Sequence, residues 1–129
     1  MSTKALLIVT ALVEVGAGVA LIGVPSLAAE ILLGAGLSNP QSLVVARVAG
    51  LAVISLGVAC WLGRNGERRA QSGLAAAMLI YNLAVPVVLV HAWIAYSFNG
   101  LAFWPACLLH TALAIWCIVC LRPIPGTAK

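Results

Sequence analysis

Residues Leu43–Leu62 read LVVARVAGLAVISLGVACWL and contain a single charged side chain, that of Arg47. The hydrocarbon core of a bilayer is about 30 Å thick, and a helix needs about 20 apolar residues to cross it. This stretch has that length, so it predicts a transmembrane helix. An arginine near the centre of such a helix costs about 2.5–3.5 kcal/mol on insertion scales. The sequence therefore raises the question of what Arg47 contacts.

The composition of the whole chain also indicates a membrane environment. Of the 129 residues, 64% are hydrophobic and 8% are charged, and the mean hydropathy is +1.14. A soluble domain carries about 25% charged residues. The length suits a single domain, residues 1–129. The net charge is +4, and all basic residues except Arg47 lie at the ends of apolar runs. We therefore expect an integral membrane protein whose solvent is the lipid bilayer and which binds no nucleic acid.

Four apolar runs predict four transmembrane helices, at about residues 5–24, 43–62, 73–98 and 102–121. Between the first two, Pro25 and Gly34 are start and stop signals for a helix that is too short to span and is expected at the interface. The predicted fold class is an all-α membrane protein, a four-transmembrane-helix bundle. A signal peptide is the alternative for the first run, but Glu14 interrupts the apolar core that such a peptide needs.

The basic residues set the predicted orientation. If the chain crosses four times, one side receives Lys4, Arg64, Arg68, Arg69, Arg122 and Lys129. The two opposite connections contain no lysine or arginine. The positive-inside rule then places both termini in the cytoplasm, and the expected location is a bacterial inner membrane.

Four ionisable residues are predicted to share one layer in the outer half of the membrane. Counted at 1.5 Å per residue, Glu14, Arg47, His91 and His110 lie between about 9 and 15 Å below the outer helix ends. One interpretation is an outward-facing pocket, with Glu14 paired to Arg47, that binds a small lipophilic or anionic ligand and serves in transport. The other interpretation is a structural ion pair together with two hydrogen-bonded histidines.

Two further features belong to the candidate site. Pro86 removes the helical hydrogen bond to the carbonyl of Asn82, which makes Asn82–Pro86 a candidate polar site. On an ideal helix His91 lies opposite Asn82, so both reach one pocket only if Pro86 bends the helix. His91 and His110, on adjacent helices, are also candidate axial ligands for a b-type haem.

No motif for phosphate binding, nucleophilic catalysis or metal-dependent hydrolysis occurs in the chain, so we assign no catalytic residue and no metal ligand, and enzyme activity is disfavoured. The cysteines are Cys60, Cys107, Cys117 and Cys120. All four lie inside apolar runs and are interpreted as small packing residues. A cluster of Cys60, Cys117 and Cys120 at the cytoplasmic ends of their helices is the alternative.

Three segments follow one another in the first half of the chain in an order that is typical of a known group. They are Val15-Gly16-Ala17-Gly18, then Pro25 with Leu32-Leu33-Gly34, then Ala46-Arg47-Val48-Ala49-Gly50. This order resembles the DoxX-like group of small four-helix membrane proteins. The resemblance implies a four-helix bundle and a quinone or other lipophilic ligand. One branch of that group is similar to the small membrane subunits of thiosulfate:quinone oxidoreductases.

Three functions are consistent with these features. The first is a binding or transport protein with an outward-facing polar pocket. The second is an accessory subunit of a larger redox or quinone-linked membrane complex. The third is a haem- or thiol-based membrane oxidoreductase. The expected protein partners are further copies of this chain or other membrane subunits.

Overall fold

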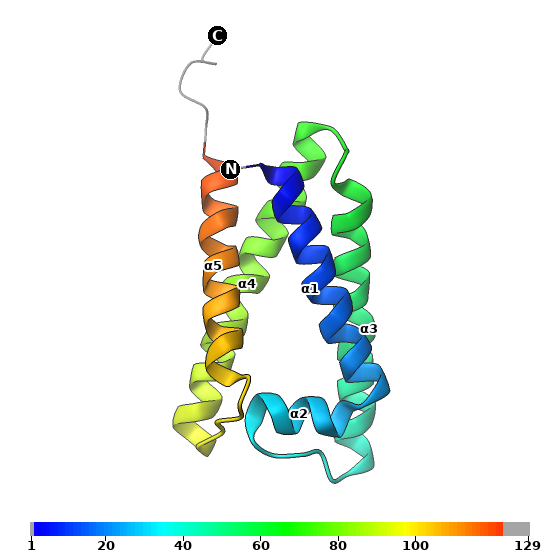
Figure 1. The fold of residues 1–129 in the computed structure, drawn as a ribbon, viewed down its shortest axis with the longest axis vertical. Coiled ribbons are helices and arrows are strands. Elements are labelled where there is room, and N and C mark those ends of the chain that lie inside the picture. The colour runs from blue at the N-terminus through cyan, green and yellow to red at the C-terminus, as the bar shows by residue number, and fades with distance from the viewer. Residues whose placement is uncertain (1, 123–129) are drawn as a thin grey trace.

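The computed structural model describes residues 2–122, and its helices follow the predicted order (Figure 1). They are α1 (Thr3–Gly23), α2 (Pro25–Leu33), α3 (Pro40–Gly63), α4 (Arg68–Tyr96) and α5 (Phe103–Leu121). All except α2 are long and apolar enough to cross a membrane. The described residues contain no strand, so the all-α four-helix membrane class is confirmed for them. Lys129, which the orientation argument used, lies outside the described residues.

Local signals explain where the helices begin and end. Asn39 caps α3, because its Oδ1 accepts a 2.7 Å hydrogen bond from the Ser42 amide, and Pro40 occupies the first helical position. α4 begins at Arg68, earlier than the predicted residue 73, so the two arginines after Glu67 are part of the helix. It ends at Tyr96 because Ser97 adopts a left-handed conformation, with φ of 58°.

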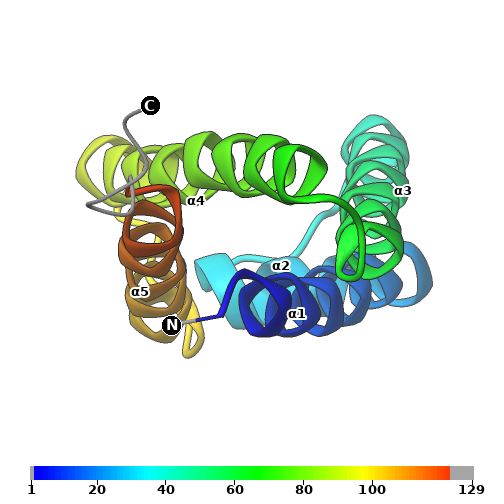
Figure 2. The same cartoon turned by 90° about the horizontal axis from the view of Figure 1, so that it is seen from above.

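The four spanning helices form two pairs. α1 packs mainly against α3, and α4 packs mainly against α5, while contacts between the pairs are sparse. Viewed along the bundle, the four helices enclose a rectangle with α2 inside it (Figure 2). The start of α1, the α3–α4 turn and the end of α5 lie at one end of the molecule (Figure 1). Following the predicted orientation, we call this the inner end and the end with α2 the outer end.

Glycines allow α1 and α3 to pack backbone against backbone. A Cβ atom on Gly18 would lie 2.6 Å from the carbonyl oxygen of Gly50, and one on Gly50 would lie 2.8 Å from that of Gly18. Closer to the inner end, a Cβ on Gly57 would lie 3.1 Å from the carbonyl oxygen of Ala11 and 2.8 Å from Cγ2 of Val15. Small residues permit such approach between helices in lipid, where there is no hydrophobic drive for association. These contacts fix the register of α1 against α3.

The two pairs meet at both ends of the molecule. At the inner end an apolar cluster from α1, α3, α4 and α5 includes Leu6, Leu7, Met78 and Leu113. At the outer end α2 is tied to the α4–α5 turn, because the Asn99 amide bonds to the Leu33 carbonyl and the Ala102 amide to the Ile31 carbonyl, both at 2.9 Å. Gly100 is required in this turn, since a side chain there would collide with the Ile31 carbonyl.

Between these junctions the pairs diverge. One face of α1 is buried at Leu7, Thr10 and Glu14, yet Ala17, the next residue on that face, is exposed. Figures 1 and 2 show α1 leaning away from α5 toward α3 as it runs to the outer end. The one buried residue of α1 further out is Gly18, which packs against α3 and has no side chain, so Glu14 is the outermost buried side chain of α1.

We predict that Gly18→Ala lowers the melting midpoint of the protein in detergent micelles, because the added methyl group collides with the α3 backbone. Overpacking of this kind costs about 1–3 kcal/mol. Gly16→Ala is the matched control: a Cβ there meets nothing within 4 Å. Its midpoint should stay the same or rise, since alanine favours helix. Equal loss in both variants would contradict the close α1–α3 contact.

Candidate functional site

A buried polar cluster lies between the two helix pairs. Its members are Thr10 and Glu14 on α1, Tyr81 and Asn82 on α4, and His110 on α5; we call it the Glu14 cluster. Thr10 and Glu14 are one turn apart on the same face of α1. Glu14 is eleven residues from the start of the 21-residue α1, so it lies near the middle of the span. The cluster is thus far from both membrane surfaces.

A chain of contacts joins the cluster. The Tyr81 side chain adjoins the Glu14 carboxyl group, to which its hydroxyl can donate a hydrogen bond. The Tyr81 ring meets the His110 ring edge-on, with 5.6 Å between centroids. His110 Nδ1 lies 2.7 Å from Asn82 Oδ1, and Asn82 Nδ2 donates to the Met78 carbonyl at 2.8 Å. The chain therefore runs from α1 through α4 to α5 and back to the α4 backbone.

These contacts assign the tautomer of His110. Because Asn82 Nδ2 donates to the Met78 carbonyl, the atom that faces His110 is the amide oxygen Oδ1, an acceptor. His110 Nδ1 must therefore carry the proton and donate it. In the neutral ring this leaves Nε2 as an acceptor. A neutral His110 therefore offers a hydrogen-bond acceptor to the cluster.

Two oxygen atoms of the cluster have no partner. Within the described residues, Glu14 Oε1 and Thr10 Oγ1 are buried without a hydrogen bond, while Glu14 is 1% exposed and Thr10 0% exposed. A buried polar group without a partner costs about 1–3 kcal/mol, and an ionised one costs more. Glu14 is therefore an ionisable side chain whose burial is not offset by a partner at Oε1.

The predicted Glu14–Arg47 pair is not formed. Val15, next to Glu14, packs level with Gly57, and Arg47 precedes Gly57 by ten residues, which is about 15 Å along α3. Arg47 is exposed, near the outer end. The sequence estimate assumed that the first two apolar runs end at one depth. Instead α3 continues outward beyond Gly23, the last residue of α1, and α2 occupies that level.

The two histidines do not share a depth either. His110 bonds to Asn82, whereas His91 follows Asn82 by nine residues, or about 13.5 Å along α4. His91 is exposed and its ring faces that of Tyr96, with 6.5 Å between centroids. Two axial ligands must flank one iron atom. His91 and His110 are thus not arranged as a haem pair, and the expected four-residue layer is reduced to Glu14 and His110.

Asn82–Pro86 falls partly within the cluster. Asn82 is 0% exposed and contributes its amide, while α4 continues as a helix through Pro86. Asn82 and His91 face different surroundings, as the ideal-helix argument expected. Whether Glu14, Arg47, His91, His110, Asn82 or Pro86 binds a ligand stays a prediction.

Tyr81 is the member of the cluster that the sequence reasoning missed. Tyrosines and tryptophans in membrane proteins concentrate at the interfaces, but Tyr81 is near the middle of α4. A hydroxyl at that depth needs a partner. Its mid-span position, directly before Asn82, was the signal available in the sequence.

The cysteines lie mostly in packed surroundings. Cys60, Cys107 and Cys117 are buried, Cys120 is half-buried, and Cys60 and Cys117 belong to the inner apolar cluster. No group of three or more histidine, cysteine or acidic side chains within residues 2–122 is arranged to hold a metal ion.

Comparison of the chain with protein-family models, with curated proteins and with solved structures gives no match. The DoxX-like resemblance therefore stays a prediction.

We predict that Asn82→Leu destabilises the protein in micelles by about 1–3 kcal/mol, the cost of leaving a buried donor unpaired. The donor is His110 Nδ1–H. The cost should shrink when His110 is already Phe, so the double-mutant cycle gives a coupling energy. His91→Leu is the control for an exposed ring and should change stability by less than about 0.5 kcal/mol. An Asn82→Leu cost that is the same with and without His110 would contradict the assigned hydrogen bond.

Proposed function

We propose that this chain is a membrane-embedded binding protein that holds a small lipophilic ligand between α1 and the α4–α5 pair, at Glu14. The observation that supports this is the buried Glu14 carboxyl group, whose Oε1 has no partner among the described residues. Ionisable residues inside membranes generally mark ligand or ion sites, because their burial is costly. A ligand that donates a hydrogen bond to Oε1 would offset that cost.

The cluster favours a ligand that donates hydrogen bonds. Its free positions are acceptors: Glu14 Oε1 and, in the assigned tautomer, His110 Nε2. Thr10 Oγ1 can accept or donate. Arg47, which would have favoured an anion, lies about 15 Å away along α3. Of the two ligand classes predicted from the sequence, lipophilic and anionic, we therefore propose the lipophilic one, and within it amines and alcohols.

The proposed entry route is the outer half of the space between the helix pairs. Ala17, one turn outward from Glu14, is exposed, whereas the inner half is filled by the apolar cluster around Leu6, Leu7 and Met78. We propose that a ligand reaches Glu14 from the outer side, because the apolar cluster fills the inner side. We propose binding, with transport requiring a rearrangement of the inner cluster.

The setting we propose is a bacterial inner membrane with both termini in the cytoplasm, supported by the basic residues at the inner end. A role as an accessory subunit of a larger membrane complex is the second candidate. The observation that supports it concerns α3. Only 17% of the most apolar stretch of α3 is buried within the chain, so most of that stretch is available to a partner. A quinone, implied by the DoxX-like resemblance, would suit the acceptor-rich cluster in its reduced form, which has two hydroxyl donors.

We predict that a cysteine at Ala17 reacts with a water-soluble maleimide added to the outside of vesicles that contain the protein, because the proposed route is open to the outer side. Leu51→Cys is the matched control. Leu51 is exposed on α3 at a similar depth, but outside the proposed route. The native cysteines are counted first by labelling the unmodified protein. Equal reactivity at the two positions, or none at Ala17, would contradict an outward-facing route.

We predict that decylamine raises the melting midpoint of the protein in nonionic micelles and that decanoate, with the same chain length, does not. The ammonium group should donate to Glu14, so Glu14→Gln should abolish most of the amine effect. Glu30→Gln is the matched control, because Glu30 is exposed on α2. Stabilisation by decanoate, or an amine effect that survives Glu14→Gln, would contradict the proposed site.

A further inference from the structure

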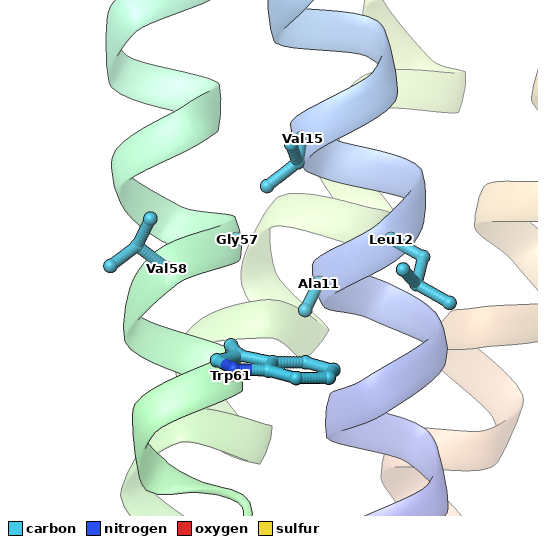
Figure 3. A pocket seen from close by; sticks show the side chains of 6 residues that line it. All are labelled: Ala11, Leu12, Val15, Gly57, Val58 and Trp61. Atoms are coloured by element: carbon cyan, nitrogen blue, oxygen red, sulfur yellow. The ribbon is translucent and has the colours of Figure 1, made fainter.

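The outer surface of the α1–α3 pair carries a second feature, an apolar groove of about 300 Å³. It is lined by Ala11, Leu12, Val15, Gly57, Val58 and Trp61 (Figure 3). The two small residues that let the helices approach, Ala11 and Gly57, leave the space between larger side chains. Leu12 is 65% exposed and Val58 46% exposed, so the groove opens to the surroundings of the bundle. In a membrane those surroundings are lipid.

The groove has a polar inner end. In Figure 3 the Trp61 indole extends from α3 across the space toward α1, inward of Ala11. The Arg64 guanidinium carbon stands 3.9 Å from the centre of that indole. Its Nη1 donates to the Trp61 carbonyl. A guanidinium has five N–H donors, so most of them remain for another acceptor.

The position of this cation matches the headgroup region. Trp61 lies near the inner end of α3, where tryptophans of membrane proteins sit at the headgroup level. Arg64 follows the last helical residue, Gly63, and is close to the basic start of α4. The apolar part of the groove therefore lies at acyl-chain depth and its cation at phosphate depth. Arginine is well suited to phosphate, because its planar fork can make two parallel hydrogen bonds.

We propose that the α1–α3 groove is a binding site for one anionic phospholipid of the inner leaflet. An acyl chain fills the groove between Val15 and Trp61, and the headgroup phosphate binds the Arg64 guanidinium, which the Trp61 indole holds in place. Net charge decides among occupants. A zwitterionic lipid also offers a phosphate, but its own ammonium group competes with Arg64 for that charge. An anionic lipid leaves its net negative charge for Arg64. Because Leu12 and Glu14 lie on opposite faces of α1, this site does not depend on the ligand proposed for the Glu14 cluster.

The test is native mass spectrometry of the full chain released from micelles containing dioleoyl phosphatidylglycerol and dioleoyl phosphatidylcholine in equal amounts. These lipids have the same acyl chains and differ in headgroup charge. We expect the first lipid adduct to favour phosphatidylglycerol by about fivefold, the factor that one basic residue near an anionic surface supplies. Arg64→Ala should reduce the preference to near one. Arg69→Ala is the matched control, because Arg69 is in the first turn of α4 and does not line the groove.

A second variant tests the acyl part. Ala11→Leu places a larger side chain in the groove and should reduce the adducts of both lipids, with the melting midpoint measured alongside to verify folding. Should this variant fail to fold, the Arg64 and Arg69 comparison decides alone. Equal binding of the two lipids by the unmodified chain would overturn the proposal. So would an equal loss in Arg64→Ala and Arg69→Ala, which would indicate general surface charge. A stable dimer that excludes lipid would assign the groove to a second copy.

Discussion

At Gly18 and Gly50 the backbones of α1 and α3 approach so closely that a methyl group on either residue would collide with the carbonyl oxygen of the other. This contact fixes how far each helix extends relative to its partner. It places the outer end of α1 near the level of Arg47 and leaves α3 to continue outward alone. α2 then covers the end of α1 and reaches the α4–α5 turn. The depth of every polar side chain on these helices follows from this register.

The same contact explains why the cluster around Glu14 lies between the two helix pairs and not within one of them. Because α1 packs mainly against α3, it leans away from α5 on the outer side of the inner apolar cluster (Figure 1). The α4–α5 pair contributes the hydrogen-bonded network of Asn82 and His110, and α1 contributes the acid. The two helix pairs are held together by the inner apolar cluster and by the α2 contacts at the outer end, and the polar groups lie between these two junctions.

The sequence was sufficient for the fold and only partly sufficient for the site. The four spans and the short helix after Pro25 follow from apolar length and from proline and glycine signals, all of which are local. Glu14, Asn82 and His110 could be recognised because a polar side chain in an apolar run is conspicuous. Their partners could not, because pairing depends on helix register. Counting residues from the ends of the runs set Arg47 beside Glu14, and the glycine contacts separate them by several turns.

The arginines and Glu14 differ in how they avoid the free-energy cost of placing a charge in the hydrocarbon region. Arg47 and Arg64 have long side chains near helix ends, so their charges can reach the headgroups while their stems remain in apolar surroundings. Glu14 is short and near mid-span, so it has no such route. The structural interpretation of Glu14 required an ion pair with Arg47, and the register of α1 and α3 removes it. A glutamine would accept the Tyr81 hydrogen bond equally well. The contacts seen around Glu14 therefore give no structural reason for an acid, which favours a ligand as the reason.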